Sequence, residues 1–406
     1  MMPNVMEGVR LLEVADWGFV PSAAAVLGDW GADVVKIEHP LRGDPIRGLV
    51  AFGKGAGGTA RSFFVEHLGR NKRSIGLDLR TKEGYDVLLK LVEGADIFLT
   101  NHLPGVRQRL HIEVEDLRKV NPNLIYAKGH GHGQRGPDAT RGGFDGLSFW
   151  ARCGVADRLT PEGKEPLGSR PAFGDSISGM FVAGGIAGAL FHRQRTGEAL
   201  EVDVSLMGAA TWVMAPDIVA AMMYGADLPR STGSGANAMR NALVAQYQCA
   251  DGRYLSLMML QEPRYWPIFC KAIGREDLMQ DERFSADDVR INHVPELVEV
   301  LKEIFKQRTR SEWSEMLNAS TCIWGPVQKP SEVPNDPQVI ANGYIMDVER
   351  EGEDTVRVAS SPVQFNSEFM RARRPAPELG AHTEEVLLEV GYDWDDITRL
   401  RQAKAI

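Results

Sequence analysis

The sequence predicts an α/β protein with a doubly wound, mostly parallel sheet in a large domain and a second, smaller α+β domain. The first observation is the alternation of short apolar runs with single helical segments through the first third of the chain. This alternation is typical of parallel βαβ units, so we expect a Rossmann-like large domain. The second is the length of 406 residues, which exceeds one ordinary domain of about 100–200 residues.

The elements of the large domain follow from apolar runs bounded by Gly, Pro and polar residues. Expected strands cover 9–14, 32–38, 74–78, 97–99, 124–128 and 200–205. Expected helices cover 21–30, 82–92, 114–120, 175–193 and a Met- and Ala-rich segment ending near 223. Pro21 fits the first helix, because proline is tolerated in a first helical turn. Residues 129–146 are expected to form a loop.

Two segments rich in Gly, Ser or Pro divide the chain. Residues 228–238 and the four prolines between 326 and 337 are predicted linkers. We therefore expect three parts: 1–227 in the large domain, 228–325 in the small domain, and 326–406 as a linker and a C-terminal part that returns to the large domain. The small domain should begin with two strands joined at the turn dipeptide Asp251-Gly252. The C-terminal part should hold a hairpin and a helix from about Thr383.

Composition indicates a globular protein of the cytoplasm. The chain is 43% hydrophobic and 25% charged, and 46 basic against 55 acidic residues give a net charge of −9 with no basic patch for nucleic acid. The four cysteines form no CxxC pair, so we expect a reducing compartment and neither disulfides nor zinc. No signal peptide is visible, and the weakly polar stretch 177–191 is shorter than the ~20 residues of a membrane span.

The segment Gly129–Gly136, GHGHGQRG, permits several interpretations. Its glycines follow a predicted strand, as in phosphate-binding loops, but the spacing is not that of G-x-G-x-x-G. His130 and His132 could ligate a metal, yet only Asp138 lies close to them in sequence, and this leaves the ligand set incomplete. We expect a Gly-rich turn that lines a cleft, and no metal.

Asp175 stands directly after Gly174, at the expected start of a helix rich in small residues. The helix dipole favours an ionised carboxylate at this position. Asp is also a favoured N-cap, so Asp175 either caps the helix or serves as a nucleophile toward an acyl group. The pattern alone leaves both readings open.

Several short stretches, taken in order, point to a family. They are Trp30–Glu38 with Gly43-Asp44, Asn71–Ser74 leading into Leu77–Leu79, Ala95–Ile97, Asn101–Arg109, Asn121-Pro122, Gly143–Asp145, Gly174-Asp175, Leu379–Thr383 and Gly391-Tyr392. Over nearly the whole chain, these stretches resemble the family III CoA-transferases. That family includes formyl-CoA and carnitine CoA-transferases and the related α-methylacyl-CoA racemases.

The resemblance implies an acyl-CoA:carboxylate CoA-transferase. In that family, the aspartate at the position of Asp175 attacks the acyl-CoA thioester and forms an acyl-aspartyl anhydride and then an aspartyl-CoA thioester. The resemblance also implies an interlocked homodimer, with acyl-CoA and carboxylic acids as substrates. Coenzyme A as the carried group is the only cofactor expected, and neither nucleic acid nor a membrane is an expected partner.

By the same resemblance, the loop Asn101–Arg109 binds coenzyme A, with Arg109 at an arginine that meets the nucleotide phosphates. We expect Asn101, His102 and His39 to take part as well. His102 replaces a lysine and His39 an arginine of the family pattern, and Gly18 replaces a glutamine near the acyl group. Formyl or oxalyl specificity is therefore not expected. The aromatic residues Phe144, Phe149, Trp150 and Phe173 flank the expected acyl site, and if they line it a bulky acyl chain fits best.

Two other functions stay open. An α-methylacyl-CoA racemase needs a second acid/base group, and Phe144 stands where the racemases have a histidine. A non-catalytic acyl-CoA binder would use Asp175 only as a cap. The loop Ser231–Asn237 is interpreted either as a cover over the active site or as a plain linker.

Overall fold

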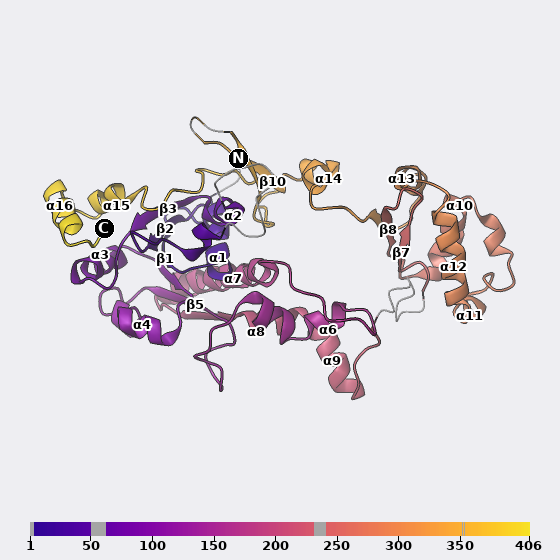
Figure 1. Ribbon diagram of the computed structural model, residues 1–406, viewed down its shortest axis with the longest axis horizontal. Helices are drawn as coiled ribbons and strands as arrows, with labels where there is room; N and C mark the ends of the chain where they lie inside the picture. The colour runs from indigo at the N-terminus through magenta and orange to yellow at the C-terminus, as the bar shows by residue number, and fades with distance from the viewer. Residues whose placement is uncertain (1–3, 50–61, 231–240, 351, 353) are drawn as a thin grey trace. The chain divides into compact units, whose positions relative to one another are not determined.

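The computed structural model describes residues 4–49, 62–230, 241–350, 352 and 354–406 (Figure 1). Six strands form one parallel sheet in the order β3-β2-β1-β4-β5-β6. They are β1 (Arg10–Val14), β2 (Asp33–Glu38), β3 (Lys72–Gly76), β4 (Ile97–Thr100), β5 (Ile125–His130) and β6 (Glu201–Ser205). This confirms the predicted doubly wound parallel sheet. The strand order reverses direction between β1 and β4, the position at which such sheets bind ligands.

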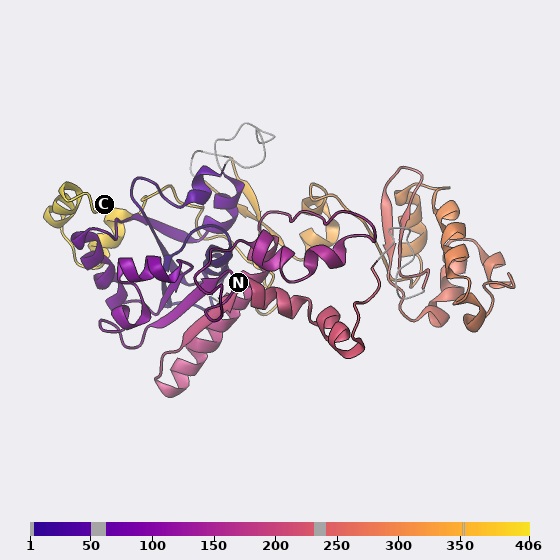
Figure 2. The ribbon, with the colours of Figure 1, turned by 60° about the horizontal axis from the view of Figure 1, so that its bottom comes forward.

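Helices cover both faces of the sheet (Figures 1 and 2). Helices α1 (Phe19–Asp29) and α7 (Phe173–Thr196) pack against each other and on one face. Helices α3 (Lys82–Glu93), α5 (Val114–Leu117), α15 (Thr383–Glu389) and α16 (Trp394–Gln402) contribute to the apolar core on the other face. The C-terminal helices thus complete a core that the first third of the chain begins.

Short elements at the edges of these layers were not expected from the sequence. They are η1 (Pro45–Gly48), α2 (Phe63–Gly69), α4 (Pro104–Leu110), the π-helical turn η2 (Gly146–Ala151) and α6 (Val155–Leu159). Strand β5 also extends to His130, so Gly129 and His130 belong to a strand and not to the predicted loop. The predicted Met- and Ala-rich helix is divided at Met214 into α8 (Leu206–Val213) and α9 (Ala215–Tyr224).

Helix α7 is the long apolar helix that carries Asp175. Its small residues let it approach α1 closely, because a methyl group on Gly179 would come within 1.8 Å of Ser22 Oγ. Among the described residues, the bent pair of α8 and α9 taken together is long and apolar enough to cross a membrane by length and composition alone, and so is α7 with its 24 residues. One of its faces is buried, however, against α1, β5 and β6, as expected for the core helix of an α/β protein.

A buried charge network joins the central strands. Glu13 on β1 pairs with Lys36 on β2 (2.7 Å) and with Lys72 on β3 (2.6 Å), and Lys36 also pairs with Asp44 (2.9 Å). All four side chains are almost inaccessible to solvent. Because an unpaired buried charge is strongly destabilising, these residues depend on one another. This network accounts for the charged positions within the apolar strands that contributed to the resemblance.

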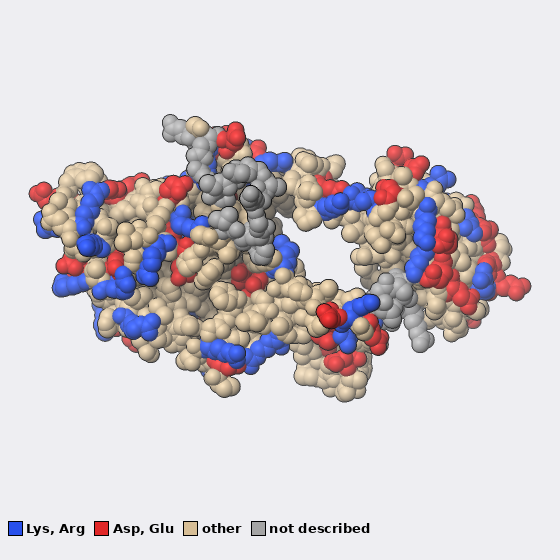
Figure 3. All heavy atoms as spheres, in the orientation of Figure 1, with Lys and Arg blue, Asp and Glu red and all other residues tan. Residues whose placement is uncertain are grey.

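The chain divides into two compact units. The first consists of 1–155, 168–214 and 335–406, and so contains both chain ends; the second consists of 156–167 and 215–334. The second unit is wider than the predicted 228–325, since it includes α9, 156–167 and residues up to 334. On the face shown in Figure 3, Lys and Arg side chains are interspersed with Asp and Glu. The predicted covering loop Ser231–Asn237 lies outside the described residues.

The second unit holds a three-stranded antiparallel sheet, β7-β8-β9, and helices around an aromatic core that includes Trp266, Phe305 and Trp313. Its elements are β7 (Gln246–Gln248), β8 (Tyr254–Leu257), α10 (Glu262–Ala272), η3 (Glu276–Met279), α11 (Asp287–Arg290), α12 (Val294–Phe305), α13 (Arg310–Asn318), β9 (Trp324–Pro326) and η4 (Val333–Asn335). In the first unit, α14 (Pro337–Ala341) precedes the hairpin of β10 (Ile345–Val348) and β11 (Val356–Ala359).

Candidate active site

Asp175 occupies the first turn of α7 and faces the loop between β1 and α1. A methyl group on Gly18 would come within 2.5 Å of Asp175 Oδ2, so only a glycine leaves this space to the carboxylate. The backbone carbonyl of Asp175 accepts a hydrogen bond from Ser22 Oγ (3.3 Å), which holds the first turn of α7 against α1. Among the described residues, no side chain or backbone group forms a hydrogen bond or an ion pair with the Asp175 carboxylate.

Asp145, not Asp175, supplies the cap of α7. Its Oδ2 accepts a hydrogen bond from Gly174 N (3.3 Å), and its Oδ1 accepts one from Gly146 N (2.8 Å). The residue at the N-cap position, Ala172, has no side chain that could accept such a bond. The interpretation of Asp175 as the cap is therefore wrong. In the described residues of the helix start, its carboxylate accepts no hydrogen bond from a backbone N–H group.

The surroundings of Asp175 favour its neutral form. Burial and, to a smaller extent, the nearby carboxylate of Asp145 together raise the pKa of the Asp175 carboxyl to about 7. This differs from the expectation that the helix start keeps Asp175 ionised. The physical reason is that desolvation and a like charge act on this carboxyl, and Asp145 already uses the hydrogen bond from Gly174 N.

If Asp175 is the nucleophile that the resemblance implies, its carboxylate must be ionised to react, and the rate of the reaction should depend on pH around neutrality. We expect kcat/KM for acyl-CoA to fall about tenfold per pH unit below a midpoint near pH 7, since the pKa of Asp175 is about 7 in the free protein. Asp145→Asn keeps an acceptor for Gly174 N and removes the like charge, so the midpoint should move to lower pH. A profile that is flat between about pH 5 and pH 8 in the wild type would contradict this assignment.

Asn101 joins the carboxyl ends of β1 and β4 at the point where the strand order reverses. Its Oδ1 accepts a hydrogen bond from Asp16 N (3.0 Å), and its Nδ2 donates one to Asp16 O (2.6 Å). Asp44 Oδ1 accepts a further bond from Trp17 N (3.1 Å). The loop Asp16–Gly18 is thus held in one conformation from both sides.

A cavity of about 680 Å³ opens at the carboxyl ends of β1 to β4. Residues that line it include Asp16 after β1, His39 after β2, Asp78 after β3, and His102 and Arg109 after β4. The side chains of Arg42 and Arg109, also in its wall, form no hydrogen bond or ion pair with residues of the described chain. Arg80 pairs with Asp78 (2.7 Å) and contacts His39 Nε2 (2.8 Å). These arginines can provide the charge-assisted hydrogen bonds that phosphates require.

The structure brings three of the four predicted coenzyme A residues to this cavity: Arg109, His102 and His39. Asn101 is absent from its lining and instead holds Asp16. Burial, with the charges of Lys36 and Arg107, lowers the pKa of His102 to about 4, so His102 is neutral near pH 7 and supplies no charge. Burial and the neighbouring Arg42 also lower the pKa of His39.

The two arginines of the Asn101–Arg109 loop differ in environment. Arg107 is buried, pairs with Glu113 (2.9 Å) and donates to the backbone carbonyl of His102 (2.8 Å). It therefore stabilises the loop. Arg109, two residues further on, is exposed and faces the cavity. The two arginines differ because they lie on different sides of the helical turn. The sequence pattern at a helix start does not show which side faces the core.

His130 and His132 do not form a metal site in the described residues. His130 ends β5, is buried, and contacts Asp203 Oδ2 through Nε2 (2.8 Å). No group of three or more His, Cys, Asp or Glu side chains in the described ranges could hold a metal ion. His132 lies instead beside Gly143, since a methyl group on that glycine would come within 3.1 Å of its Nε2. The segment thus supports the loop that carries Phe144 and Asp145.

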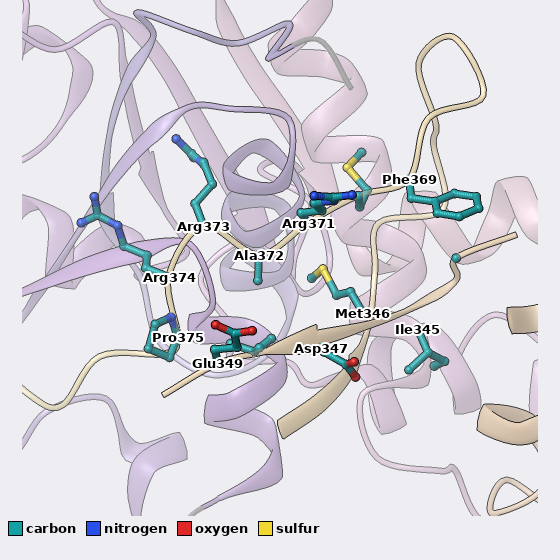
Figure 4. A pocket seen from close by; sticks show the side chains of 13 residues that line it. Ile345, Met346, Asp347, Glu349, Phe369, Arg371, Ala372, Arg373, Arg374 and Pro375 are labelled. Carbon is teal, nitrogen blue, oxygen red and sulfur yellow. The ribbon is translucent and has the colours of Figure 1, made fainter. Parts of the chain in front are cut away.

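A second cavity, of about 460 Å³, lies between β10 and the segment 369–375 (Figure 4). Its wall combines Met346, Phe369 and several charged side chains. Arg373 and Arg374 point away from Asp347, and Arg373 donates to the carbonyls of Gly28 and Ala32 (both 2.8 Å). This segment therefore attaches the C-terminal part to the end of α1, and the cavity contains neither Asp175 nor the ends of the parallel strands.

Five residues near the site had no role predicted from the sequence: Asp16, Trp17, Arg42, Arg80 and Asp145. Burial and the nearby carboxylate of Asp44 raise the pKa of Asp16 to about 6. Asp145 lay within a stretch that contributed to the resemblance, and Arg42 lies next to Gly43-Asp44, so both had a signal in the sequence. No sequence pattern pointed to Trp17, because its contacts with Asp44 and Phe144 form only in the folded protein.

The fold and the site together define a class of protein. It is an α/β protein with a cavity of about 680 Å³ at the reversal of strand order and an unpaired, half-buried carboxylate beside the same loop. The chain belongs to CoA-transferase family III, whose family model matches residues 6–383. It is therefore a CoA-transferase with an acyl-CoA-type substrate, as the resemblance implied.

Relatives in this family act on different acids. The (R)-2-hydroxy-4-methylpentanoate CoA-transferase of Clostridioides difficile is 32% identical, over 99% of this chain and 99% of that protein. The succinyl-CoA:glutarate CoA-transferase of Homo sapiens is 27% identical, over 99% of this chain and 90% of that protein. A solved structure of a CAIB/BAIF family protein from Brucella suis has a TM-score of 0.83 and 26% identity, covering 96% of this chain and 100% of that one.

Proposed function

We propose that this CoA-transferase moves coenzyme A between carboxylic acids through covalent intermediates on Asp175. The observation that carries the proposal is the Asp175 carboxylate itself, which lies beside Gly18 and takes no part in capping α7. A buried carboxylate without a partner is destabilising, so its presence needs a reason other than stability. Nucleophilic attack on an acyl group is such a reason.

The proposed reaction balances without any further cofactor. The Asp175 carboxylate attacks the thioester carbonyl of the donor and the C–S bond breaks. An acyl-aspartyl anhydride forms, and the CoA thiolate is released. The thiolate then attacks the carbonyl of Asp175 and releases the donor acid as a carboxylate. The acceptor carboxylate attacks the resulting aspartyl-CoA thioester, the C–S bond breaks, and an anhydride of the acceptor acid and Asp175 forms with release of the CoA thiolate. The thiolate finally attacks the acceptor carbonyl of this anhydride. This last step forms the new acyl-CoA and restores the Asp175 carboxylate.

In this proposal, the nucleotide part of coenzyme A binds in the cavity at the carboxyl ends of β1 to β4. Arg42 and Arg109 offer unpaired guanidinium groups there, and Arg80 offers one that is shared with Asp78. The loop Asp16–Gly18 leads from this cavity, where Asp16 lies in the wall, to Asp175, where Gly18 is in contact. In this arrangement the phosphates are held at one end of the loop and the thioester reacts at the other.

Arg109→Ala should raise KM for every acyl-CoA by about tenfold with little change in kcat, since a phosphate contact acts equally on ground state and transition state. Steady-state kinetics with several acyl-CoA esters would measure this. Lys119→Ala, which removes an exposed cation from the large unit, is the matched control and should change neither constant. An effect of Arg109→Ala that differs widely between acyl chains would place this residue at the acyl group instead.

The covalent intermediate can be tested directly. Wild-type protein is incubated with a 2-methylacyl-CoA in deuterium oxide, with and without an added carboxylic acid, and then treated with hydroxylamine. We expect a hydroxamate at Asp175 by peptide mass spectrometry, transfer of CoA to the added acid, and no exchange of the α-hydrogen by NMR. Absence of the hydroxamate together with enzyme-dependent α-exchange at the rate of turnover would reject the transferase in favour of a racemase.

The geometry argues against the racemase. A second base would have to face the α-carbon, and Asp145 is the carboxylate that lies near Asp175. Both oxygens of Asp145 already accept backbone hydrogen bonds, from Gly174 N and Gly146 N. Phe144, at the position of the racemase histidine, cannot exchange a proton.

We also propose a homodimer, and the interlocked form is what the family resemblance implies. Large apolar side chains are exposed on the described chain, among them Phe191 on α7 (60%) and Trp212 on α8 (71%), and none of the residues of α9 is buried. Such surfaces are typical of subunit interfaces. We expect light scattering and native mass spectrometry to show a dimer that persists at nanomolar concentration. An active monomer would contradict this proposal.

A further inference from the structure

Two aromatic residues, Trp17 and Phe144, lie on the two loops that meet the first turn of the Asp175 helix. Trp17 precedes Gly18, which touches the Asp175 carboxylate, and Phe144 precedes Asp145, which caps the helix of Asp175. The rings of Trp17 and Phe144 meet edge to face, with centroids 5.5 Å apart at 87°. The four residues and Asp175 therefore form one continuous neighbourhood within the first unit.

Core packing does not account for this pair of rings. Phe144 is 54% exposed, whereas Phe149, on the same segment, is fully buried against Gly174. The predicted aromatic set is thus divided: Phe149 belongs to the core, and Phe144 faces solvent beside Asp175. An exposed aromatic ring next to a reactive carboxylate is suited to contact a ligand.

Trp17 is held in an unfavourable backbone conformation. Its φ of 69° lies in the left-handed region, which residues with large side chains seldom adopt. Asn101 fixes the preceding residue by two hydrogen bonds, and Asp44 accepts one from Trp17 N. The fold therefore maintains a strained residue whose ring meets that of Phe144, and such strain is typical of residues that contact ligands.

Within the described residues, the charges around Asp175 disfavour a second carboxylate in the acyl group. Among the described residues, the charged group that acts on Asp175 is another carboxylate, that of Asp145, and no cation does so. Arg170 lies over the ring of Phe173, with its guanidinium carbon 5.6 Å from the ring centroid, and forms no ion pair with Asp175. A second carboxylate on the substrate would lose its hydration next to two carboxyl groups and gain no counter-charge.

We propose, as an extension that rests on the proposed function, that the acyl group is a branched or aromatic monocarboxylic acid whose apolar body lies against Trp17 and Phe144. Dicarboxylic acids are poor substrates. The relatives act on acids of both kinds, so family membership does not predict which kind this protein uses. The aromatic residues Trp17 and Phe144 and the charges near Asp175 favour the apolar monocarboxylic acids.

Identity exchange tests this without the need to know the natural donor. Each acid, labelled with ¹³C, is mixed with its own unlabelled CoA ester, and the entry of label into the ester is followed by mass spectrometry. We expect kcat/KM for 4-methylpentanoate and 3-phenylpropanoate to exceed that for succinate and glutarate by about 100-fold or more. Exchange of glutarate or succinate at an equal or higher rate would overturn the proposal.

Variants separate ring contact from structure. Phe144→Ala should lower exchange of the two apolar acids by about tenfold and leave that of acetate nearly unchanged, and Phe144→Leu should restore most of the loss. Trp394→Ala, at an exposed aromatic residue of α16, is the control and should have no effect. An equal loss for all acids in Phe144→Ala would assign the ring a structural role and reject the inference.

Arg170→Ala tests the alternative that Arg170 binds a second carboxylate of a dicarboxylic substrate. We expect no change in the ratio of dicarboxylic to apolar exchange, and a selective loss of dicarboxylic exchange would overturn the proposal. The two levels of inference fail differently. Absence of exchange for every acid, with no adduct on Asp175, would refute the proposed function. Exchange that favours dicarboxylic acids would refute only the acyl specificity.

Discussion

Replacing Asp175 by alanine is expected to lower CoA transfer by about 10⁴-fold or more, because the variant lacks the group that forms both covalent intermediates. Binding of coenzyme A should remain, since the arginines of the nucleotide cavity are untouched. Steady-state rates with acyl-CoA and an acceptor acid measure the first effect, and calorimetric titration with coenzyme A measures the second. Full activity in the variant would reject the site.

Stability distinguishes this loss from unfolding. The pKa of Asp175 is raised to about 7 in the folded protein, against about 3.9 for an unfolded chain, so the folded state binds this proton more tightly. The stability that the proton provides is present below about pH 4 and is lost as pH rises to about 7. At pH 8 the ionised carboxylate is therefore destabilising, and Asp175→Ala should unfold at the same or a higher temperature than the wild type.

An aspartate that truly caps a helix provides the matched control. Asp336 accepts hydrogen bonds from Gln338 N (2.7 Å) and Val339 N (3.3 Å) at the start of α14. Asp336→Ala should lower the free energy of unfolding by about 1 kcal/mol and leave CoA transfer unchanged. The two aspartates thus show opposite patterns: one change removes activity and spares stability, and the other does the reverse.

Gly18→Ala is expected to lower kcat by about 100-fold or more while the fold is retained. The added methyl group would lie 2.5 Å from Asp175 Oδ2, so the carboxylate must move from its position. The backbone of Gly18 has φ −100° and ψ −44°, which alanine adopts readily, so the effect does not come from backbone strain. Steady-state kinetics and thermal unfolding on the same preparation distinguish a lower kcat from a loss of the fold.

Gly325→Ala, in β9, controls for the substitution itself, because its methyl group would meet no atom within 4 Å. This variant should have wild-type kcat and an unchanged unfolding temperature. A Gly18→Ala protein with wild-type kcat would show that the Asp175 carboxylate reacts from another position than the one described. A loss confined to KM would instead assign Gly18 to the binding of substrate.

Several features of this protein were determined by the sequence alone. Short apolar runs separated by helical segments predicted the parallel sheet, since each strand and helix follows from local periodicity. Gly174-Asp175 at the start of a helix of small residues identified the candidate nucleophile, and the family resemblance named Arg109, His102 and His39, which line the cavity at the strand ends. These signals are local, or belong to short stretches that keep their order along the chain.

The chemistry of the site was decided only by the tertiary structure. Which aspartate caps α7 depends on the approach of Asp145 to Gly174, and the space for the nucleophile depends on the approach of Gly18 to Asp175. The sequence left open whether Asp175 caps the helix or acts as a nucleophile, and it predicted an ionised carboxylate, whereas burial and Asp145 raise the pKa of Asp175. Burial and electrostatic interaction depend on distance in space, and residues far apart in the chain acquire those distances only when the sheet and its helices have packed.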